Sequence, residues 1–513
     1  MKKTISILLA ALTALLPLLP LLSLSSCSDG GAPEETAPVS QTAPADPSGE
    51  NAAPDPEETR ILPELPEVTY DGADFRMYQW DTNNWHVWDD LWVESLTGEP
   101  INDAVFSREV QMEQTYDVKV SLLIDNYLKY EENLRNAVTS GEDSWEVVVS
   151  MGHDIPRLYP YNVFYNLHDV PYLDFDKPWW NKNCNDSFTL AGYMPFTVSD
   201  MTILDKGVTA ACFFNKNMAA DYGLGSLYDN VLENTWTIAR MIELGEVVET
   251  DLDGNGIRDD NDRYGLVCGD DPVYMLFHSA GGRYISKDED GYPVLSFQSE
   301  YNFTVIPYYL EYVMYDENLT CNNSFKDGRA DCVDMFREDH GLFLMKTLSA
   351  TNSLREMESD FGILPIPKYD SAQDSYSSSV SVFGGNLISV PTTCGHLDMA
   401  GVLLEAMAAY SHYTLIPAFY DTVLKEKSAR DAESTEMLDI IIAGMVFDVG
   451  DYYNLADFPD YFLRITGSAA HLGRDPRTSD IASFWKKKQK IVEADLKKLV
   501  KVIDGWKEMQ NGG

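Results

Sequence analysis

The chain has 513 residues and a formal net charge of −44 at pH 7, with 82 acidic side chains against 38 lysines and arginines. A surface this acidic repels phosphate backbones and anionic membranes, which argues against a nucleic-acid-binding protein. Neutral and cationic ligands stay possible. The length suits two lobes of ordinary domain size better than one small core.

The first 26 residues predict an export signal. Lys2 and Lys3 precede an apolar run that begins at Ile5, and this order is typical of a secretory signal. The run ends in LSSC at residues 24–27, which resembles the lipobox of bacterial lipoproteins. The resemblance implies that residues 1–26 are removed, that Cys27 is acylated, and that the chain is extracytoplasmic and lipid-anchored to the cell membrane. The alternative is an uncleaved signal anchor.

Residues 27–66 are predicted to be an acidic tether. The stretch is rich in Pro, Ala, Glu, Ser and Thr and nearly free of aromatic and branched side chains. Such a composition cannot bury enough apolar surface to fold. We therefore expect the folded part of the chain to begin near residue 67.

After the tether, predicted strands alternate with predicted helices. The strands are ADFRMYQW (73–80), YDVKVSLLI (116–124) and WEVVVS (145–150), and helical periodicity fills residues 101–116 and 127–141. This order predicts an α/β fold with an open parallel sheet.

The ends of these strands supply the first candidate ligand-binding residues. Ligands of open α/β sheets lie outside the carboxyl ends of the strands. Trp80 and Asp81 end the first strand, and His153 and Asp154 follow the third. We predict that these four side chains line a cleft; for His153 the alternative is a solvated loop histidine.

The second half of the chain continues the alternation. VTAACFFNKNMAADYGL (208–224) predicts a strand and a short helix, TWTIARMIELGEVVE a helix capped by Thr235, and HSAGGRYISKDEDGYPVLSF a glycine-bearing segment and a hairpin. FGILPIPKYD and NLISVP (386–391) are predicted strands. The C-terminal stretch SFWKKKQKIVEADLKKLVKVIDGWKEM is a predicted amphipathic helix with solvated lysines.

Residues 251–262, DLDGNGIRDDND, crowd acidic side chains around two glycines. The spacing matches the EF-hand calcium loop, in which oxygen ligands occupy positions 1, 3, 5, 7, 9 and 12 and glycine occupies position 6. The corresponding ligands here are Asp251, Asp253, Asn255, the carbonyl of Ile257, Asp259 and Asp262. Aspartate at the last position, where the EF-hand has glutamate, resembles the dockerin-type variant. We predict a structural calcium site; the alternative is a solvated turn.

Six cysteines follow Cys27, and they show neither CxxC nor Cys/His metal spacing. Cys212 and Cys268 lie in apolar surroundings and are predicted to be buried thiols. Cys321 and Cys332 could pair across a short loop, so the disulfide state stays open.

The order of segments resembles the substrate-binding lipoproteins of carbohydrate ABC importers, the extracellular solute-binding family (family 1-like). The residues that carry the resemblance are FFNKNMAADYGL, TWTIARMIELGEVVETDLDGNGIRDDNDRYGL and FREDHGLFLMKTLSATNSLREMESDFGILPIPKYD, behind a lipoprotein signal and a tether. The likeness covers residues 70–500, approximately. It implies a two-lobed, type II-like periplasmic-binding-protein fold with a ligand cleft between the lobes and ABC permease subunits as partners.

Matching segments to this family implies the lobe boundaries and further site residues. Lobe one comprises residues 67–203 and 350–412, and lobe two comprises residues 204–349 and 413–513. Besides His153 and Asp154, the family implies ligand contacts from Asp200, Phe214, Thr347 and Ser349. No tryptophan lies at the return crossing, which argues against a long oligosaccharide as the ligand.

Sugar recognition needs flat apolar faces and planar hydrogen-bonding groups, so aromatic, carboxylate and amide side chains recur in such sites. Trp85 and Trp88 are candidate stacking faces. Trp179 and Trp180 are further candidates, although paired tryptophans after a proline are more often core residues. Arg283, after two glycines, either reaches a ligand or belongs to a tight turn.

Two other classes of protein compete with transport binding. A glycan-active enzyme needs two carboxylates that face each other across a cleft, and no strand end singles out such a pair. A serine hydrolase would carry Gly-x-Ser-x-Gly, which does not occur in the sequence. A glycan-binding adhesion or sensing lipoprotein is the third class. We therefore expect a non-enzymatic binding protein for a carbohydrate or other small neutral solute.

Overall fold

The computed structural model describes residues 60–81, 88–322, 330–424, 432–459, 462 and 480–511. The predicted signal, Cys27, the tether up to residue 59 and Trp85 lie outside the described residues. All of the architecture belongs to the unit that spans residues 61–513.

The first sheet has the strand order β12-β3-β1-β2. Its strands are β1 (Ala73–Trp80), β2 (Val118–Asp125), β3 (Val147–Met151) and β12 (Asn386–Ser389). β1 pairs in parallel with β2 and β3, as the sequence predicted, and β12 adds an antiparallel edge. All five residues of β3 are buried, which explains its unbroken apolar run.

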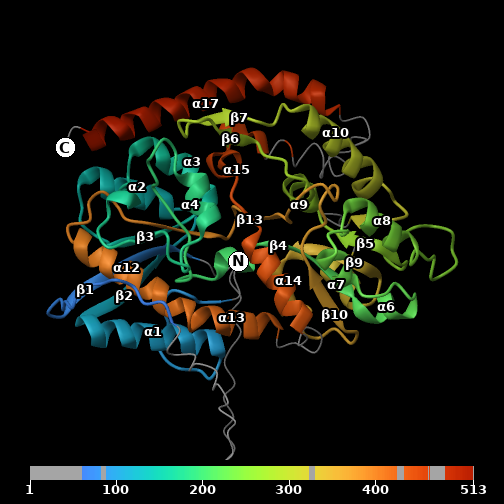
Figure 1. Cartoon of the computed structure of the whole chain (residues 1–513), viewed down its shortest axis with the longest axis horizontal. Helices are drawn as coiled ribbons and strands as arrows, with labels where there is room; N and C mark the ends of the chain where they lie inside the picture. Colours follow the sequence, from blue (N-terminus) through green and yellow to red (C-terminus); the bar gives the residue numbers. More distant parts are fainter. Residues whose placement is uncertain are drawn as a thin grey trace, which may run out of the picture. The chain divides into compact units, whose positions relative to one another are not determined.

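The helices α1 (Pro100–Tyr116), α2 (Tyr130–Ser140) and α12 (Leu397–His412) lie around this sheet (Figure 1). Gly141 ends α2 in the left-handed conformation, with φ at 82°, and its N–H bonds back to the last turn of the helix. A residue with a side chain is strained in this conformation, so the glycine fixes where the helix ends.

The second sheet has the order β10-β4-β9-β5-β8. Its strands are β4 (Ala210–Asn215), β5 (Tyr264–Cys268), β8 (Thr320–Asn322), β9 (Gly341–Thr347) and β10 (Phe361–Leu364). β5 is parallel to both β8 and β9, whereas β4 is antiparallel to β9 and β10. We expected residues 361–364 in lobe one, but the backbone of β10 pairs with β4 in this second sheet.

Many shorter helices surround the two sheets. They are α3 (Ile155–Leu158), α4 (Lys182–Phe188), α5 (Leu204–Gly207), α6 (Lys216–Asp221), α7 (Leu227–Leu232), α8 (Ile238–Glu246), α9 (Pro272–Ser279), α10 (Glu300–Tyr309), α11 (Cys332–Arg337), α13 (Leu415–Leu424), α14 (Ala432–Ala443) and α15 (Val449–Tyr453). α8 begins later than predicted, because the hydroxyl of Thr237, not Thr235, caps its N-terminus.

Two small sheets and one long helix complete the fold. β6 (Ile285–Lys287) and β7 (Pro293–Leu295) form the predicted hairpin, and β11 (Ser378–Ser379) pairs with β13 (Met445–Val446). The helix α17 (Ile481–Asn511) runs past α10 and the hairpin (Figure 1). None of the helices in the described part of the chain combines the length and the apolar character that a membrane span requires.

Candidate functional site

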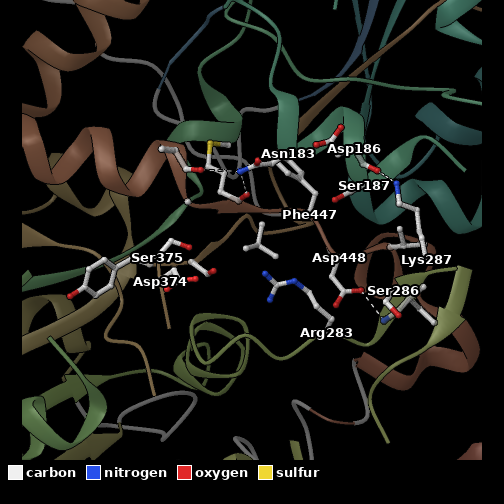
Figure 2. Close-up of a pocket in the computed structure, with 18 of the residues that line it drawn as sticks. Asn183, Asp186, Ser187, Arg283, Ser286, Lys287, Asp374, Ser375, Phe447 and Asp448 are labelled. Carbon is white, nitrogen blue, oxygen red and sulfur yellow. Dashed lines mark hydrogen bonds between the residues drawn. The ribbon is translucent and has the colours of Figure 1, made fainter. Parts of the chain in front are cut away.

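A pocket of about 740 Å³ lies among four segments that are far apart in the sequence (Figure 2). It is lined by α4, by residues 283–287 before and within β6, by residues 374–377, and by residues 440–449 around β13. Its volume falls within the range of small-molecule sites. Two of these segments belong to predicted lobe one and two to predicted lobe two.

Arg283 is the cation at the centre of this pocket. Its guanidinium points into the pocket toward the segment of Asp374 and Ser375 (Figure 2). The Nη1 atom donates to the carbonyl oxygens of Gly282 at 2.6 Å and of His278 at 3.2 Å. Burial lowers the pKa of Arg283, and the nearby acidic side chains of Asp448 and Asp451 oppose that shift.

The turn before Arg283 depends on its two glycines. Gly281 has φ at 82°, and a Cβ atom on Gly282 would lie 2.4 Å from the ring of Phe277. Because neither position accepts a side chain without strain or a clash, the turn is fixed. The glycine pair therefore positions the arginine that the sequence marked as a candidate.

Asp448 closes the base of the pocket, and sequence reasoning missed it. Its Oδ2 accepts the backbone N–H of Tyr284 at 2.6 Å, and its Oδ1 accepts the N–H of Gly450 at 2.7 Å. The carboxylate thus caps α15 and holds the start of β6 at once. Burial raises the pKa of Asp448 to about 6, with a smaller contribution from Asp451.

His278 and Asp451 form a buried pair behind Arg283. The Nε2 atom of His278 lies 2.8 Å from Oδ2 of Asp451, and its Nδ1 lies 3.1 Å from the carbonyl oxygen of Gly282. Both ring nitrogens therefore face oxygen atoms. No local sequence motif predicts this pair, because its members lie 173 residues apart in the sequence.

The rest of the lining combines polar side chains with apolar ones, among them Ile285, Ile440, Val446 and Val449. The Nδ2 atom of Asn183 donates to the carbonyl oxygens of Ala443 at 3.0 Å and Met445 at 2.9 Å, which ties α4 to β13. Lys287 donates to the carbonyl oxygen of Asp186 on the other side. Hydroxyl groups and rings complete the wall: Ser187, Ser286, Ser375, Ser377, Tyr376 and Phe447.

His153 and Asp154 lie together at the end of β3, as the sequence predicted. The His153 ring lies 4.7 Å from the ring of Phe383, and the His153 N–H donates to the carbonyl oxygen of Val382 at 3.0 Å. This corner is lined on its other side by Asp451 and Tyr452 of α15. α15 thus contributes residues to both the Arg283 pocket and the His153 corner.

The carboxyl group of Asp154 is almost fully buried, and one of its oxygens lacks a hydrogen-bond partner among the described residues. Its side chain is 1% exposed; Oδ1 lies 3.6 Å from Arg157, and Oδ2 has no hydrogen-bond partner among the described residues. Burial raises the pKa of Asp154 to about 7. A buried carboxylate oxygen without a partner is costly, so this site favours the protonated acid.

Other predicted site residues lie in the core or near it. Trp80 is fully buried, and its indole N–H donates to Oδ1 of Asn386 at 3.2 Å. Phe214 is buried edge-on against Tyr228, at 5.3 Å between ring centroids. The Trp88 ring packs over Gly207. Asp81 is partly exposed, and its N–H donates to the carbonyl oxygen of Asp125.

Thr347 and Ser349 lie side by side where β9 ends. Their hydroxyl oxygens are 2.9 Å apart, and both side chains are partly buried. The next N–H, of Leu348, donates to the carbonyl oxygen of Thr209. The structure therefore brings the predicted return crossing next to the first one, but places neither hydroxyl among the residues that line the Arg283 pocket.

Trp179 and Trp180 are core residues, the alternative that the sequence favoured. Both rings are buried, and both indole N–H groups donate to Glu405, at 3.0 and 2.9 Å. A single buried carboxylate therefore satisfies both rings.

The cysteines in the described part of the chain are buried. Cys212 and Cys268 are buried, as predicted. Cys332 is a free thiol, so it forms no disulfide with Cys321.

The acidic loop has a geometry that fits a hard cation. Ligand oxygens of Asp251, Asp253 and Asp262 lie within 4.8 Å of one another. Asp262 is fully buried and accepts the N–H groups of Leu252 at 3.1 Å and Asp259 at 3.0 Å. Calcium takes six to eight oxygen ligands, and the loop supplies carboxylates, an amide oxygen and carbonyls.

Hydrogen bonds between Asp251 and two glycines of the loop fix its turns. Asp251 accepts the N–H groups of Gly254 at 2.7 Å and Gly256 at 2.9 Å, and both glycines have positive φ. These bonds lower the pKa of Asp251, with Gly256 contributing most. The carboxylate of Asp251 therefore faces the backbone of its own loop.

No family model and no curated protein matches the sequence. Solved structures resemble the fold. The sugar-binding protein MalE of Xanthomonas citri is 12% identical over 86% of this chain and 100% of its own, with a TM-score of 0.56. The GacH receptor of Streptomyces glaucescens, solved without ligand and with acarbose, is 15% identical over 82% of this chain and 99% of its own, with a TM-score of 0.53.

An ABC substrate-binding protein of Listeria monocytogenes, solved with cycloalternan, is 12% identical over 85% of this chain and 100% of its own, with a TM-score of 0.51. At such identities the likeness concerns the fold. The chain therefore has the two-lobed α/β periplasmic-binding-protein fold that the sequence predicted, and its structural neighbours are sugar-binding proteins.

Proposed function

We propose that the chain is a cell-surface substrate-binding lipoprotein that captures an extracellular carbohydrate and delivers it to an ABC permease. The single observation that carries the proposal is the pocket around Arg283, which lies among segments of both predicted lobes. Its fold supports the same conclusion, because proteins of similar fold are described as binding maltose-type, cyclic or acarbose-like sugars.

The chemistry of the pocket suits hydroxyl-rich ligands. Serine hydroxyls, the amide of Asn183 and the guanidinium of Arg283 donate or accept hydrogen bonds, and Phe447 offers apolar contact. His153 and Phe383 line the neighbouring corner and offer a polar ring and an apolar face there. Sugar sites combine such polar groups with apolar faces.

The proposal includes the parts of the chain that the sequence predicted and the structure does not test. Cys27 carries the lipid anchor, and residues 27–60 form the tether, because the compact unit begins at Ile61. The lobes comprise residues 67–203 with 350–412 and residues 204–349 with 413–513, except that residues 361–364 pair into the sheet of the second lobe. The loop at residues 251–262 binds calcium for structural reasons. The protein binds its ligand without converting it.

A ligand screen with product analysis tests the function. Calorimetry of the mature chain against mono- and oligosaccharides is expected to give saturable binding near the micromolar range, equivalent to about −8 kcal/mol. Chromatography of the same mixtures is expected to return each sugar unchanged. Turnover of any sugar would instead support the glycan-active enzyme, and silence across the panel would reject carbohydrate capture.

A membrane-fractionation experiment tests the anchor separately. Cys27→Ala in the producing cell is expected to release the protein from the membrane fraction, because no described helix is able to span a membrane. A variant that stays in that fraction as the parent does would reject acylation at Cys27.

A further inference from the structure

The helix α17 carries a charge that is opposite to that of the rest of the chain. Residues 481–511 contain eight lysines and four acidic residues, whereas the whole chain has a net charge of −44. The polar face of an amphipathic helix is solvated equally well by a mixture of positive and negative side chains. The excess of lysine on this one helix therefore calls for an explanation.

The inner face of α17 is fixed by aromatic packing. The Trp485 ring lies 5.3 Å from Phe297 and 5.1 Å from Phe458, and the Trp506 ring stacks on Tyr193 at 4.6 Å. Between these two tryptophans, the buried residues recur at helical spacing: Val492, Leu499 and Ile503. The helix is thus held at both ends, and its opposite face is set outward.

That outward face is a stripe of lysine side chains. We define the lysine stripe as the exposed residues Lys486, Lys487, Lys490, Lys497, Lys498 and Lys501. Their spacing places them on one side of the helix, over a length of about 22 Å. The other exposed side chains in the middle of this face are apolar: Ile491, which is 54% exposed, and Ala494.

Most of the stripe is not neutralised by its neighbours. Lys498 pairs with Asp495 at 2.6 Å. By contrast, no acidic group of the described residues lies within ion-pair distance of Lys486, Lys490, Lys497 or Lys501. Charges farther away than about 8 Å are largely screened at physiological salt. The stripe therefore acts as a local cationic surface despite the net charge of the chain.

We propose that the lysine stripe docks on the anionic headgroups of a lipid bilayer. All of its cations are lysines, which are compact point charges without the fork that arginine offers to a single carboxylate or phosphate. A straight row of point charges fits a diffuse, fluid array of lipid phosphates. The exposed Ile491 lies at the centre of the lysine stripe and would face the membrane–water interface. The stripe is thus a local exception to the expectation, drawn from the net charge, that the surface of the chain repels anionic membranes.

The stripe and the proposed acyl anchor have different physical roles. The acyl anchor holds the chain through apolar burial, whereas a polybasic patch attracts it to the headgroups through charge. The stripe would also select which side of the folded unit faces the bilayer. This inference rests on the residues of α17 and is independent of which ligand the pocket binds.

Vesicle binding tests the proposal with the full mature chain carrying Cys27→Ala, so that no acyl chain contributes. The probes are vesicles of phosphatidylcholine alone and vesicles with an equal part of phosphatidylglycerol. The test variant is the triple Lys490→Gln, Lys497→Gln, Lys501→Gln. The matched control is the triple Lys119→Gln, Lys129→Gln, Lys182→Gln, which removes three exposed lysines outside α17.

The parent and the control are expected to sediment with the phosphatidylglycerol vesicles and not with pure phosphatidylcholine. The α17 triple is expected to bind at least about tenfold more weakly, since each lysine near an anionic surface contributes to attraction. Melting curves confirm that all variants fold. Absence of parental binding, equal binding to both vesicles, or equal loss in both triples overturns the proposal. A different outcome would assign the stripe to contact between copies of the chain: the parent fails to bind vesicles but self-associates in a salt-sensitive way, and only the α17 triple loses this self-association.

Discussion

The Nζ atom of Lys206 lies 3.1 Å from Oδ1 of Asp200, with 5% and 13% of the two side chains exposed. Lys206 also lies 3.3 Å from Oδ2 of Asp205, and Oδ2 of Asp200 lies 2.6 Å from Nδ1 of His412. Asp200 and His412 fall at two of the predicted crossings between lobes. Both oxygens of Asp200 are therefore engaged by the crossing segments, which favours a hinge role for the residue over ligand contact.

Lys206→Ala is expected to destabilise the protein strongly. Asp205 is fully buried, and removal of its cationic partner leaves an uncompensated carboxylate in the core. The free energy of unfolding, measured with denaturant, is expected to fall by about 3–5 kcal/mol. The control Lys182→Ala removes an exposed lysine and should change it little. A loss below about 1 kcal/mol would show that the buried network is not coupled to folding.

Glu405 is expected to be essential for packing of the tryptophan pair. It is 1% exposed and accepts hydrogen bonds from Trp179, Trp180 and the N–H of Asp174. Glu405→Ala leaves these donors unpaired, and each unpaired buried donor costs about 1–3 kcal/mol. Glu405→Gln retains one acceptor oxygen and is expected to lose less. Thermal unfolding followed by tryptophan fluorescence compares the two variants; equal losses would contradict the hydrogen-bond account.

Asp154 is expected to make stability fall as pH rises through neutrality. The pKa of this carboxyl is raised to about 7 by burial, so the folded state binds the proton more tightly than the unfolded state. The resulting stability is fully present below about pH 4 and is lost as pH rises through about 7. Asp154→Asn should flatten this part of the pH profile by roughly 1–3 kcal/mol.

The measurement is the denaturant midpoint between pH 4 and pH 8. Burial also raises the pKa of Glu109 to about 7 and that of Asp205 to about 6. These two groups contribute to the pH dependence of stability equally in the parent and in the variant. The difference between the profiles therefore isolates Asp154. The control Asp176→Asn alters an exposed carboxyl and should leave the profile unchanged. A parallel profile for Asp154→Asn would reject the raised pKa.

Periodicity in the sequence predicted the strands well, because each strand buries a recognisable face or both faces. β1, predicted at residues 73–80, has these bounds in the structure, and β3 follows its apolar run. Such signals are local. The assignment of β10 to the wrong sheet shows the limit, since the sequence of a short buried strand does not say which neighbour it pairs with.

The candidate site depends on contacts that no local pattern encodes. His278 and Asp451 meet across 173 residues, and Asp448 is joined to Tyr284 across 164. Trp80 was a candidate because strand ends face ligands, but a tryptophan can also pack inward, as it does here. Among the predicted site residues that the structure describes, only Arg283 combines a local signal, its two preceding glycines, with a place in the pocket.

The loop at residues 251–262 is expected to stabilise the protein when calcium is present. Exposed extracellular sites of this type bind at roughly 10⁻⁴ to 10⁻³ M, so about 5 mM calcium should add about 1–2 kcal/mol to the free energy of unfolding. Asp251→Ala should abolish this increment, whereas Asp290→Ala, at an exposed acidic turn outside the loop, should retain it. A melting temperature that neither calcium nor a chelator moves would remove calcium from the fold.

Arg283 is expected to contribute more to ligand affinity than any other single side chain of the pocket. Its guanidinium points into the cavity (Figure 2), and only its Nη1 atom donates to carbonyl oxygens of the described residues. Arg283→Ala should weaken binding of whichever sugar the screen identifies by about 1.5–3 kcal/mol, the range for hydrogen bonds to a charged group. Arg283→Lys keeps the charge but not the fork, so it should restore only part of this affinity.

Calorimetry with the identified sugar measures these changes. The matched control is Arg337→Ala, which removes an arginine of α11 that pairs with Asp334 away from the pocket. Because Arg283 also offsets the charges of the nearby Asp448 and Asp451, the melting temperature of the ligand-free variant is measured as well, and Arg283→Lys controls for the loss of charge. Unchanged affinity in Arg283→Ala, with the fold intact, would place the ligand elsewhere. The corner formed by His153, Phe383 and Tyr452 would then be the next site to test by the same titration.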